Sequence, residues 1–147
     1  MVSRDKNKST IELWSKLFQA PNIENYISEN MDIKLPAFSE YITLLCELKK
    51  EKPERIIKKA NIDISYGHRL FSGGRNPSRD TVLQFAFAFE LSSDETQQLL
   101  KIARMAPLHP KVKRDAVIAY YLHTKKSLDE VQTFLYENGL PILGKSI

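Results

Sequence analysis

Apolar residues recur along the chain at intervals of three and four positions, and no stretch of useful length alternates with the two-residue period of a strand. Residues 10–19 show the helical pattern first, and Pro21 ends it. The apolar positions of this segment are Ile11, Leu13, Trp14, Leu17 and Phe18. The hydrophobic pattern therefore predicts an all-α fold.

Residues that begin or end helices divide the rest of the chain. Pro53 suits the first turn of a helix, and Asp63 and Ser78 are typical N-cap residues. Gly73 is typical of the left-handed residue that follows a helix. With these signals, we expect helices at about residues 22–29, 36–48, 64–72, 79–90, 111–124 and 127–138, another that begins at Pro53, and another that is capped by Ser92 or Ser93 and includes residues 99–103.

Size and composition fit one globular domain, or one domain with an appendage. The chain has 147 residues, of which 42% are apolar and 27% charged. Charged residues interrupt every apolar stretch well before about 18 positions, so we expect no membrane span. The polar start, MVSRDKNKST, predicts no secretory signal and a cytoplasmic protein. The single cysteine, Cys46, excludes an internal disulfide and is expected in the core.

Residues 52–78, KPERIIKKANIDISYGHRLFSGGRNPS, are the most informative stretch of the chain. Two short helical patterns flank a tight corner at Ala60, Asn61 and Ile62, and a basic loop follows Gly73 and Gly74. Residues 52–79 hold seven Lys/Arg against two acids, whereas the whole chain has a net charge of only +4. A short helix, a turn, a short helix and a basic rim are typical of an element that lays a helix in the DNA major groove.

A repeat appears when the chain is aligned with itself at a shift of 35 residues. Residues 79–83, RDTVL, then align with 114–118, RDAVI, and residues 92–97, SSDETQ, align with 127–132, SLDEVQ. At least six identities lie in register, which indicates two copies of a capped helical hairpin. We expect the second copy to pack on the first and extend its core; the alternative is a groove for a partner.

Residues 60–66, ANIDISY, and 70–78, LFSGGRNPS, resemble the helix-turn-helix of the lambda-repressor-like proteins, the family of Cro and phage repressors also called XRE-type regulators. The resemblance covers about residues 36–91, and the pattern from RNPSRD at residues 75–80 to KRDAVI at residues 113–118 resembles members with a longer helical C-terminus. It implies a five-helix bundle that binds DNA as a dimer on palindromic operators. It also implies that residues 52–61 form the second helix, residues 64–72 the recognition helix and residues 94–105 the fifth helix.

In this geometry the first turns of the recognition helix face the base edges. The residues expected there are Ile64, Ser65, Tyr66, His68 and Arg69. We expect Arg69 to read a base directly, because a guanidinium pairs bidentately with O6 and N7 of guanine.

The residues expected to contact DNA phosphates are Lys52, Arg75, Asn76 and Arg79. Arg75 has the alternative role of binding carbonyls in the Gly73–Gly74 loop. Arg79 has the alternative of a structural role at a helix start, because its Arg-Asp pair recurs at Arg114.

Two departures from the family pattern weaken specific readout. No Gln or Asn stands at the leading positions of the recognition helix. Gly67 takes the place of an apolar core residue, and a glycine inside a helix costs about 0.5–1 kcal/mol relative to Ala. We therefore expect the recognition helix to pack less firmly than in the family.

Nothing in the sequence indicates catalysis or a bound cofactor. His68, His109 and His123 are far apart and have no companion Cys ligands, so we expect no metal. The Gly73–Gly74 pair belongs to no phosphate-binding glycine motif, and there is no nucleophile elbow or HExxH. Acids in first helical turns favour the helix dipole, which explains them without acid–base chemistry. We expect a protein that is not an enzyme.

Two functional hypotheses remain. The first is a sequence-specific transcription regulator, most simply a repressor, that binds double-stranded DNA as a homodimer. The second is an antitoxin-like or adaptor module whose N-terminal arm or C-terminal hairpin binds a protein partner, with weak or lost DNA specificity. The expected domains are an arm at residues 1–35, the helix-turn-helix domain at 36–108 and the hairpin extension at 109–147.

Overall fold

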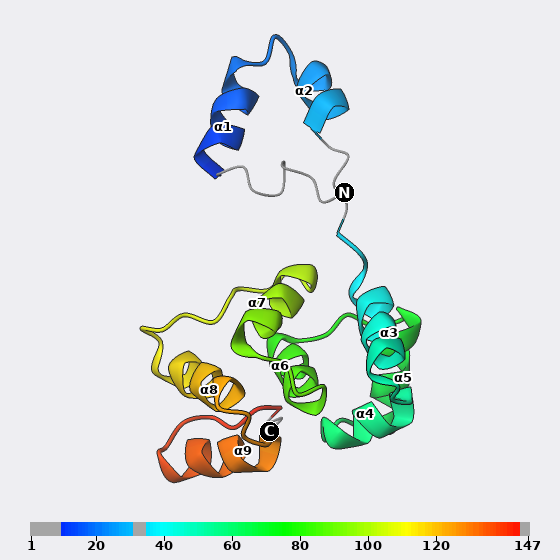
Figure 1. The fold of residues 1–147 in the computed structure, drawn as a ribbon, viewed down its shortest axis with the longest axis vertical. Helices are drawn as coiled ribbons and strands as arrows, with labels where there is room; N and C mark the ends of the chain where they lie inside the picture. Colours follow the sequence, from blue (N-terminus) through cyan, green and yellow to red (C-terminus); the bar gives the residue numbers. More distant parts are fainter. Residues whose placement is uncertain (1–9, 31–34, 145–147) are drawn as a thin grey trace. The chain divides into compact units, whose positions relative to one another are not determined.

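The computed structural model describes residues 10–30 and 35–144, and every regular element within those ranges is an α-helix (Figure 1). The prediction of an all-α protein is confirmed. The chain divides into two compact units, residues 1–35 and residues 36–147.

The first unit holds two short helices, α1 (Thr10–Gln19) and α2 (Ile23–Asn30). The rings of Trp14 and Phe18, one helical turn apart on α1, stack with their centroids 5.6 Å apart. Both rings are nevertheless exposed, Trp14 by 54% and Phe18 by 77%. This unit therefore leaves large aromatic side chains uncovered.

The second unit begins with α3 (Phe38–Lys49), α4 (Pro53–Lys59) and α5 (Ile64–Ser72). Asn61 takes the left-handed conformation in the corner between α4 and α5, with φ 58°. The Asp63 carboxylate accepts the Tyr66 N–H at 3.0 Å and so caps α5. Gly73, with φ 88°, ends α5 as its position predicts.

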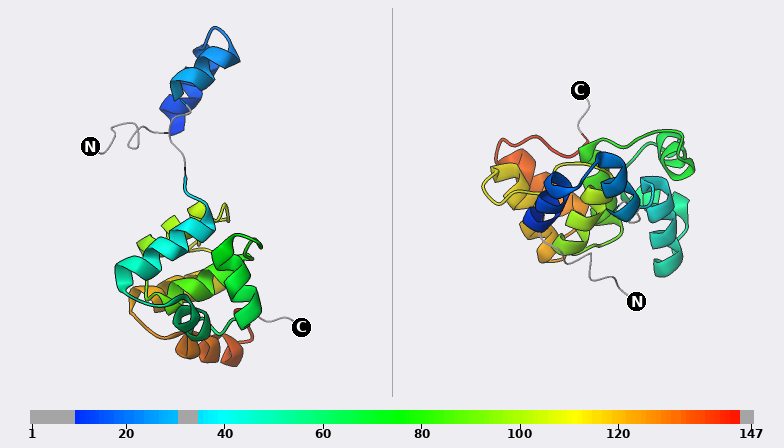
Figure 2. Two further views of the ribbon diagram at one scale, coloured as in Figure 1. Left: turned by 90° about the vertical axis from the view of Figure 1, so that its right-hand side faces the viewer. Right: turned by 90° about the horizontal axis from the view of Figure 1, so that it is seen from above.

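Helix α6 (Arg79–Ala88) is the centre of this unit, with every residue from 81 to 88 buried. The Phe85 ring lies 6.0 Å from the ring of Phe38 on α3 and 5.8 Å from that of Phe71 on α5. Helices α3–α5 therefore pack on one side of α6 (Figure 2).

Helices α6 and α7 (Ser93–Ile102) form one hairpin, and α8 (Lys113–His123) and α9 (Leu128–Glu137) form another. The same hydrogen bonds recur in both at the 35-residue shift. Ser92 and Glu95 make a capping box on α7, as Ser127 and Glu130 do on α9. The sequence repeat is thus also a structural repeat.

The loop after each hairpin is fixed by one glutamine. Gln97 donates to the Leu108 carbonyl at 3.0 Å and accepts the Leu108 N–H at 2.8 Å. Gln132 makes the same two bonds with Leu143, at 2.8 and 2.7 Å. Each loop therefore takes the same course from its hairpin.

The two hairpins exchange arginine–aspartate pairs. Arg79 of the first hairpin binds both carboxylate oxygens of Asp115 in the second, at 3.1 and 2.9 Å. Arg114 of the second binds both oxygens of Asp80 in the first, at 3.1 and 3.0 Å. In addition, α6 packs on α9 and α7 on α8. Because each contact has a reciprocal counterpart, a pseudo-twofold axis relates the hairpins.

Several helix ends differ from the prediction: α4 ends at Lys59 instead of residue 61, and α6 ends at Ala88 instead of residue 90. Helix α7 ends at Ile102 instead of residue 105, because Arg104 takes the left-handed conformation with φ 60°. Helix α8 begins at Lys113 instead of residue 111. The loop before it is held by the His109 N–H, which donates to the Asp115 carboxylate at 3.1 Å.

Candidate nucleic-acid interface

Helices α4 and α5 pack closely because Gly67 has no side chain. A Cβ atom at Gly67 would lie 2.5 Å from Cγ2 of Ile57 on α4, a distance that real Cβ atoms do not reach. Ile57 and Gly67 are both buried. The expectation that Gly67 loosens the packing of α5 is wrong, because this glycine permits the close approach of the two helices.

The corner between α4 and α5 is tied to the core by Gln84. Its amide nitrogen donates to the Ala60 carbonyl at 2.9 Å, and the side chain is buried in α6. Sequence reasoning missed this residue. A single glutamine inside the apolar run of α6 was the available signal, since a buried polar side chain needs a hydrogen-bond partner.

Helix α5 turns one polar face away from the core. Gly67 and Leu70 are buried, whereas Ser65, His68, Arg69 and Ser72 are exposed. With about 100° between successive residues, the exposed residues share one side of the helix. Ser72, seven positions after Ser65, was not predicted as a site residue. Ile64, at the start of the helix, is 50% exposed.

Among the predicted base-contacting residues, Arg69 is the most available cation. Its guanidinium makes no hydrogen bond or ion pair with the described residues, while its carbonyl accepts the Gly74 N–H at 2.9 Å. The backbone at Arg69 is therefore fixed, and its side chain is free to contact a ligand.

Tyr66 and Arg75 form a pair beside the exposed face. The Arg75 guanidinium lies over the Tyr66 ring, 5.3 Å from its centroid. Tyr66 is half-buried and packs against the core. The Arg75 side chain is thus held on an aromatic ring, and the alternative of binding carbonyls of the Gly73–Gly74 loop is not observed among the described residues.

The other predicted phosphate contacts lie on different elements. Lys52 is the N-cap residue of α4 and is exposed, and Asn76 is exposed in the loop before α6. Arg79 differs, because Nε donates to the Ala106 carbonyl and Nη2 to the Pro107 carbonyl, both at 3.0 Å. With the two bonds to Asp115, four of its five N–H donors are used. We therefore assign Arg79 the structural role that was the alternative to a phosphate contact, and we leave it out of the proposed interface.

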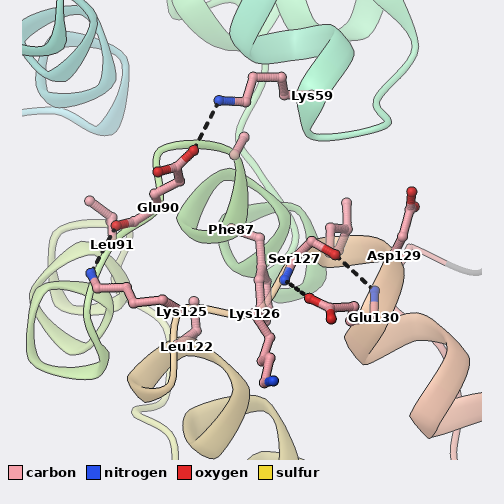
Figure 3. A pocket seen from close by; sticks show the side chains of 12 residues that line it. Lys59, Phe87, Glu90, Leu91, Leu122, Lys125, Lys126, Ser127, Asp129 and Glu130 are labelled. Atoms are coloured by element: carbon pink, nitrogen blue, oxygen red, sulfur yellow. Dashed lines mark hydrogen bonds and ion pairs between the residues drawn. The ribbon is translucent and has the colours of Figure 1, made fainter.

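Lys59 is also held by the protein. It lines a hollow of about 390 Å³ where α4 meets the corners of the two hairpins (Figure 3). Its Nζ lies 3.4 Å from the Glu90 carboxylate, and the Lys125 Nζ donates to the Glu90 carbonyl at 3.3 Å. Glu90 thus links α4 to the hairpin corners.

Residues 10–30 and 35–144 also contain metal-binding types of side chain and the single cysteine. No group of three His, Cys, Asp or Glu side chains there is placed to hold a metal ion. Burial, followed by the charges of Glu51 and Glu47, raises the pKa of the Cys46 thiol to about 11. No described helix has the length and apolar character needed to cross a membrane.

Comparison of the chain with protein-family models, with curated proteins and with solved structures finds no match. The functional conclusion therefore depends on the residues and their geometry.

Proposed function

We propose that this protein binds double-stranded DNA by inserting α5 into the major groove, with α4 and α5 acting as a helix-turn-helix. The observation that carries the proposal is the exposed polar face of α5, on which Arg69 has no bonding partner in the described residues. Gly67 and Gln84 hold this face rigidly, by close packing and by a hydrogen bond to the corner. A rigid element with free polar groups is what base readout requires.

Each side chain of the face has a specific role in the proposed complex. Arg69 pairs with O6 and N7 of a guanine. Ser65 and His68 donate to or accept from base edges or phosphates, and Ile64 contacts a thymine methyl group. Tyr66 is proposed at a base edge or a phosphate beside the α5 N-terminus.

The proposed phosphate contacts are Lys52, Arg75 and Asn76. They supply affinity and orientation but carry no sequence information. Arg75 is the best oriented of these, because the Tyr66 ring beneath it restricts the guanidinium. We propose that the protein acts as a transcription regulator, most simply a repressor, and binds its site as a homodimer.

A salt titration with duplex DNA tests this function. Fluorescence anisotropy should show binding that weakens as salt rises, with a slope of log K against log[salt] of about −0.9 per neutralised phosphate. Lys52 and Arg75 are the charged phosphate contacts of each chain, so four neutralised phosphates predict a slope of about −3.6 for a dimer. Absence of binding at low salt would reject the proposal.

The exposed, stacked Trp14 and Phe18 of the first unit favour a second candidate, an adaptor that binds a protein partner. Aromatic side chains of this kind are common anchors at protein interfaces. Purification from the native host separates the two functions. A stoichiometric second protein, lost in a Phe18→Glu variant, supports the adaptor, whereas DNA binding by the purified chain alone supports the regulator.

A further inference from the structure

The pseudo-twofold axis relates one face of the second hairpin to a face of the first hairpin. Phe85 of α6 corresponds to Tyr120 of α8, because the repeats are shifted by 35 residues. Phe85 lies on the side of α6 that carries α3–α5, where its ring contacts Phe38 and Phe71. The side of α8 that carries Tyr120 therefore corresponds by symmetry to the side of α6 on which α3–α5 pack.

That position is uncovered in the second hairpin. Phe85 is fully buried, whereas Tyr120 is 63% exposed. Gln84 binds the α4–α5 corner, but its counterpart Ala119 lines a hollow of about 380 Å³ together with Tyr120 and His123. A hairpin face that holds three helices in one copy is thus open in the other.

The open face keeps an aromatic surface. The Tyr120 ring lies 6.4 Å from that of Tyr121, and the Tyr121 ring lies 5.6 Å from that of Phe134 on α9. Tyr121 and Phe134 are half-buried and line a second hollow of about 380 Å³. Tyrosine and phenylalanine beside hollows are typical of the anchors that dominate protein–protein binding.

Opposite charges lie on the two helices of this face. Lys113 is seven positions before Tyr120, so it shares that side of α8. Glu130 and Glu137 are four positions before and three after Phe134, so they share its side of α9, which has no Lys or Arg. Lys113 and Glu137 are exposed and form no ion pair with any described residue.

We propose that the Tyr120–Tyr121–Phe134 face binds the same face of a second copy of this chain. A twofold axis parallel to the helices lays α8 of each copy on α9 of the other. The four-residue loop 124–127 between α8 and α9 favours an antiparallel pair, and with the helices so arranged the axis sets Lys113 opposite Glu137 of the second copy. Attraction between these opposite charges selects the second copy as the occupant.

This proposal rests on the homodimer of the proposed function and identifies the surface that forms the dimer. No residue of α5 lines either hollow, so dimerisation leaves both copies of α5 available to DNA. The dimer forms without DNA, and its failure is therefore distinguishable from a failure of DNA binding.

Sedimentation equilibrium of the full chain without DNA tests the interface. The wild-type protein should be a dimer at micromolar concentration, and Tyr120→Glu should raise the dimer dissociation constant at least about thirtyfold, as expected on losing a central anchor. Tyr136→Glu is the matched control: Tyr136 is 79% exposed on α9 and lines neither hollow, so the dimer should be unchanged. Circular dichroism checks that both variants keep their helices.

A charge exchange tests the arrangement itself. Lys113→Glu should weaken the dimer, and adding Glu137→Lys in the same chain should restore it, because each pair then has its signs reversed. A wild-type monomer at 100 µM, on the order of the weakest useful affinity, would overturn the proposal. So would a dimer that survives Tyr120→Glu but is lost in Phe18→Glu, since the first unit would then be the interface.

Discussion

The arginine side chains fall into two groups by the number of partners each guanidinium has. Arg79 binds Asp115 and two carbonyls, while the Arg69 guanidinium has no partner in the part of the chain that the structure describes. Burial raises the pKa of Asp115, but hydrogen bonds from Arg79 and His109 outweigh burial and hold that pKa below its ordinary range. A carboxyl with a lowered pKa stabilises the fold above about pH 4, and this contribution is lost as the pH falls further.

Because the two Arg–Asp pairs are related by symmetry, their contributions to the free energy of unfolding can be compared directly. The Asp115 side chain is 7% exposed and that of Asp80 is 30% exposed. Arg79→Ala therefore leaves a buried carboxylate unpaired and should lower the free energy of unfolding by about 3 kcal/mol. Arg114→Ala leaves a carboxylate closer to water and should cost about 1–2 kcal/mol.

Urea denaturation at pH 7 measures both values. Arg79→Lys should recover little of the loss, because an ammonium cannot reproduce the bidentate pair and the two carbonyl bonds together. Equal losses for the two alanine variants would contradict the role given to burial.

At the scale of the element, α4 and α5 act as one unit because their backbones approach closely at Gly67. The sequence shows a glycine inside a helix, which by itself predicts loosened packing. Only the three-dimensional distance to Ile57 identifies what the missing side chain makes room for. By contrast, the caps at Asp63 and Ser78 are local, and the sequence predicted both correctly.

Gly67→Ala tests this packing. Alanine gains about 1 kcal/mol of helix propensity, but overpacking against Ile57 costs about 1–3 kcal/mol, so the net loss in unfolding free energy should be about 1 kcal/mol. The displaced α5 should also bind DNA less tightly. Thermal unfolding of the single variants and of the double variant Gly67→Ala/Ile57→Ala provides the measurement.

The double variant should be more stable than the sum of its two single effects predicts, because Ile57→Ala removes the atoms that the new Cβ meets. Strict additivity would show that Gly67 and Ile57 are not coupled, and the account of the α4–α5 contact would fail.

At the scale of the whole molecule, the sequence predicted the all-α class and the repeated hairpin, because helical periodicity and capping residues are local signals. It did not predict how the hairpins pair. Each copy contains the same Arg-Asp dipeptide, and the sequence alone does not say whether Arg79 takes Asp80 or Asp115. That choice is made by packing, which also decides that Arg79 is structural and that Tyr120 remains exposed.

The central claim is that α5 reads DNA sequence, and selection from a random duplex library with the purified full chain tests it most directly. The account predicts a motif with two symmetric half-sites that persists as salt rises. Arg69→Ala should lose the preference for guanine at one position of each half-site, at a cost of about 1–3 kcal/mol per site. Lys101→Ala, which removes one charge from the exposed side of α7, should leave the motif unchanged. Recovery of no motif, or equal weakening by Arg69→Ala on every sequence, would contradict base reading by α5.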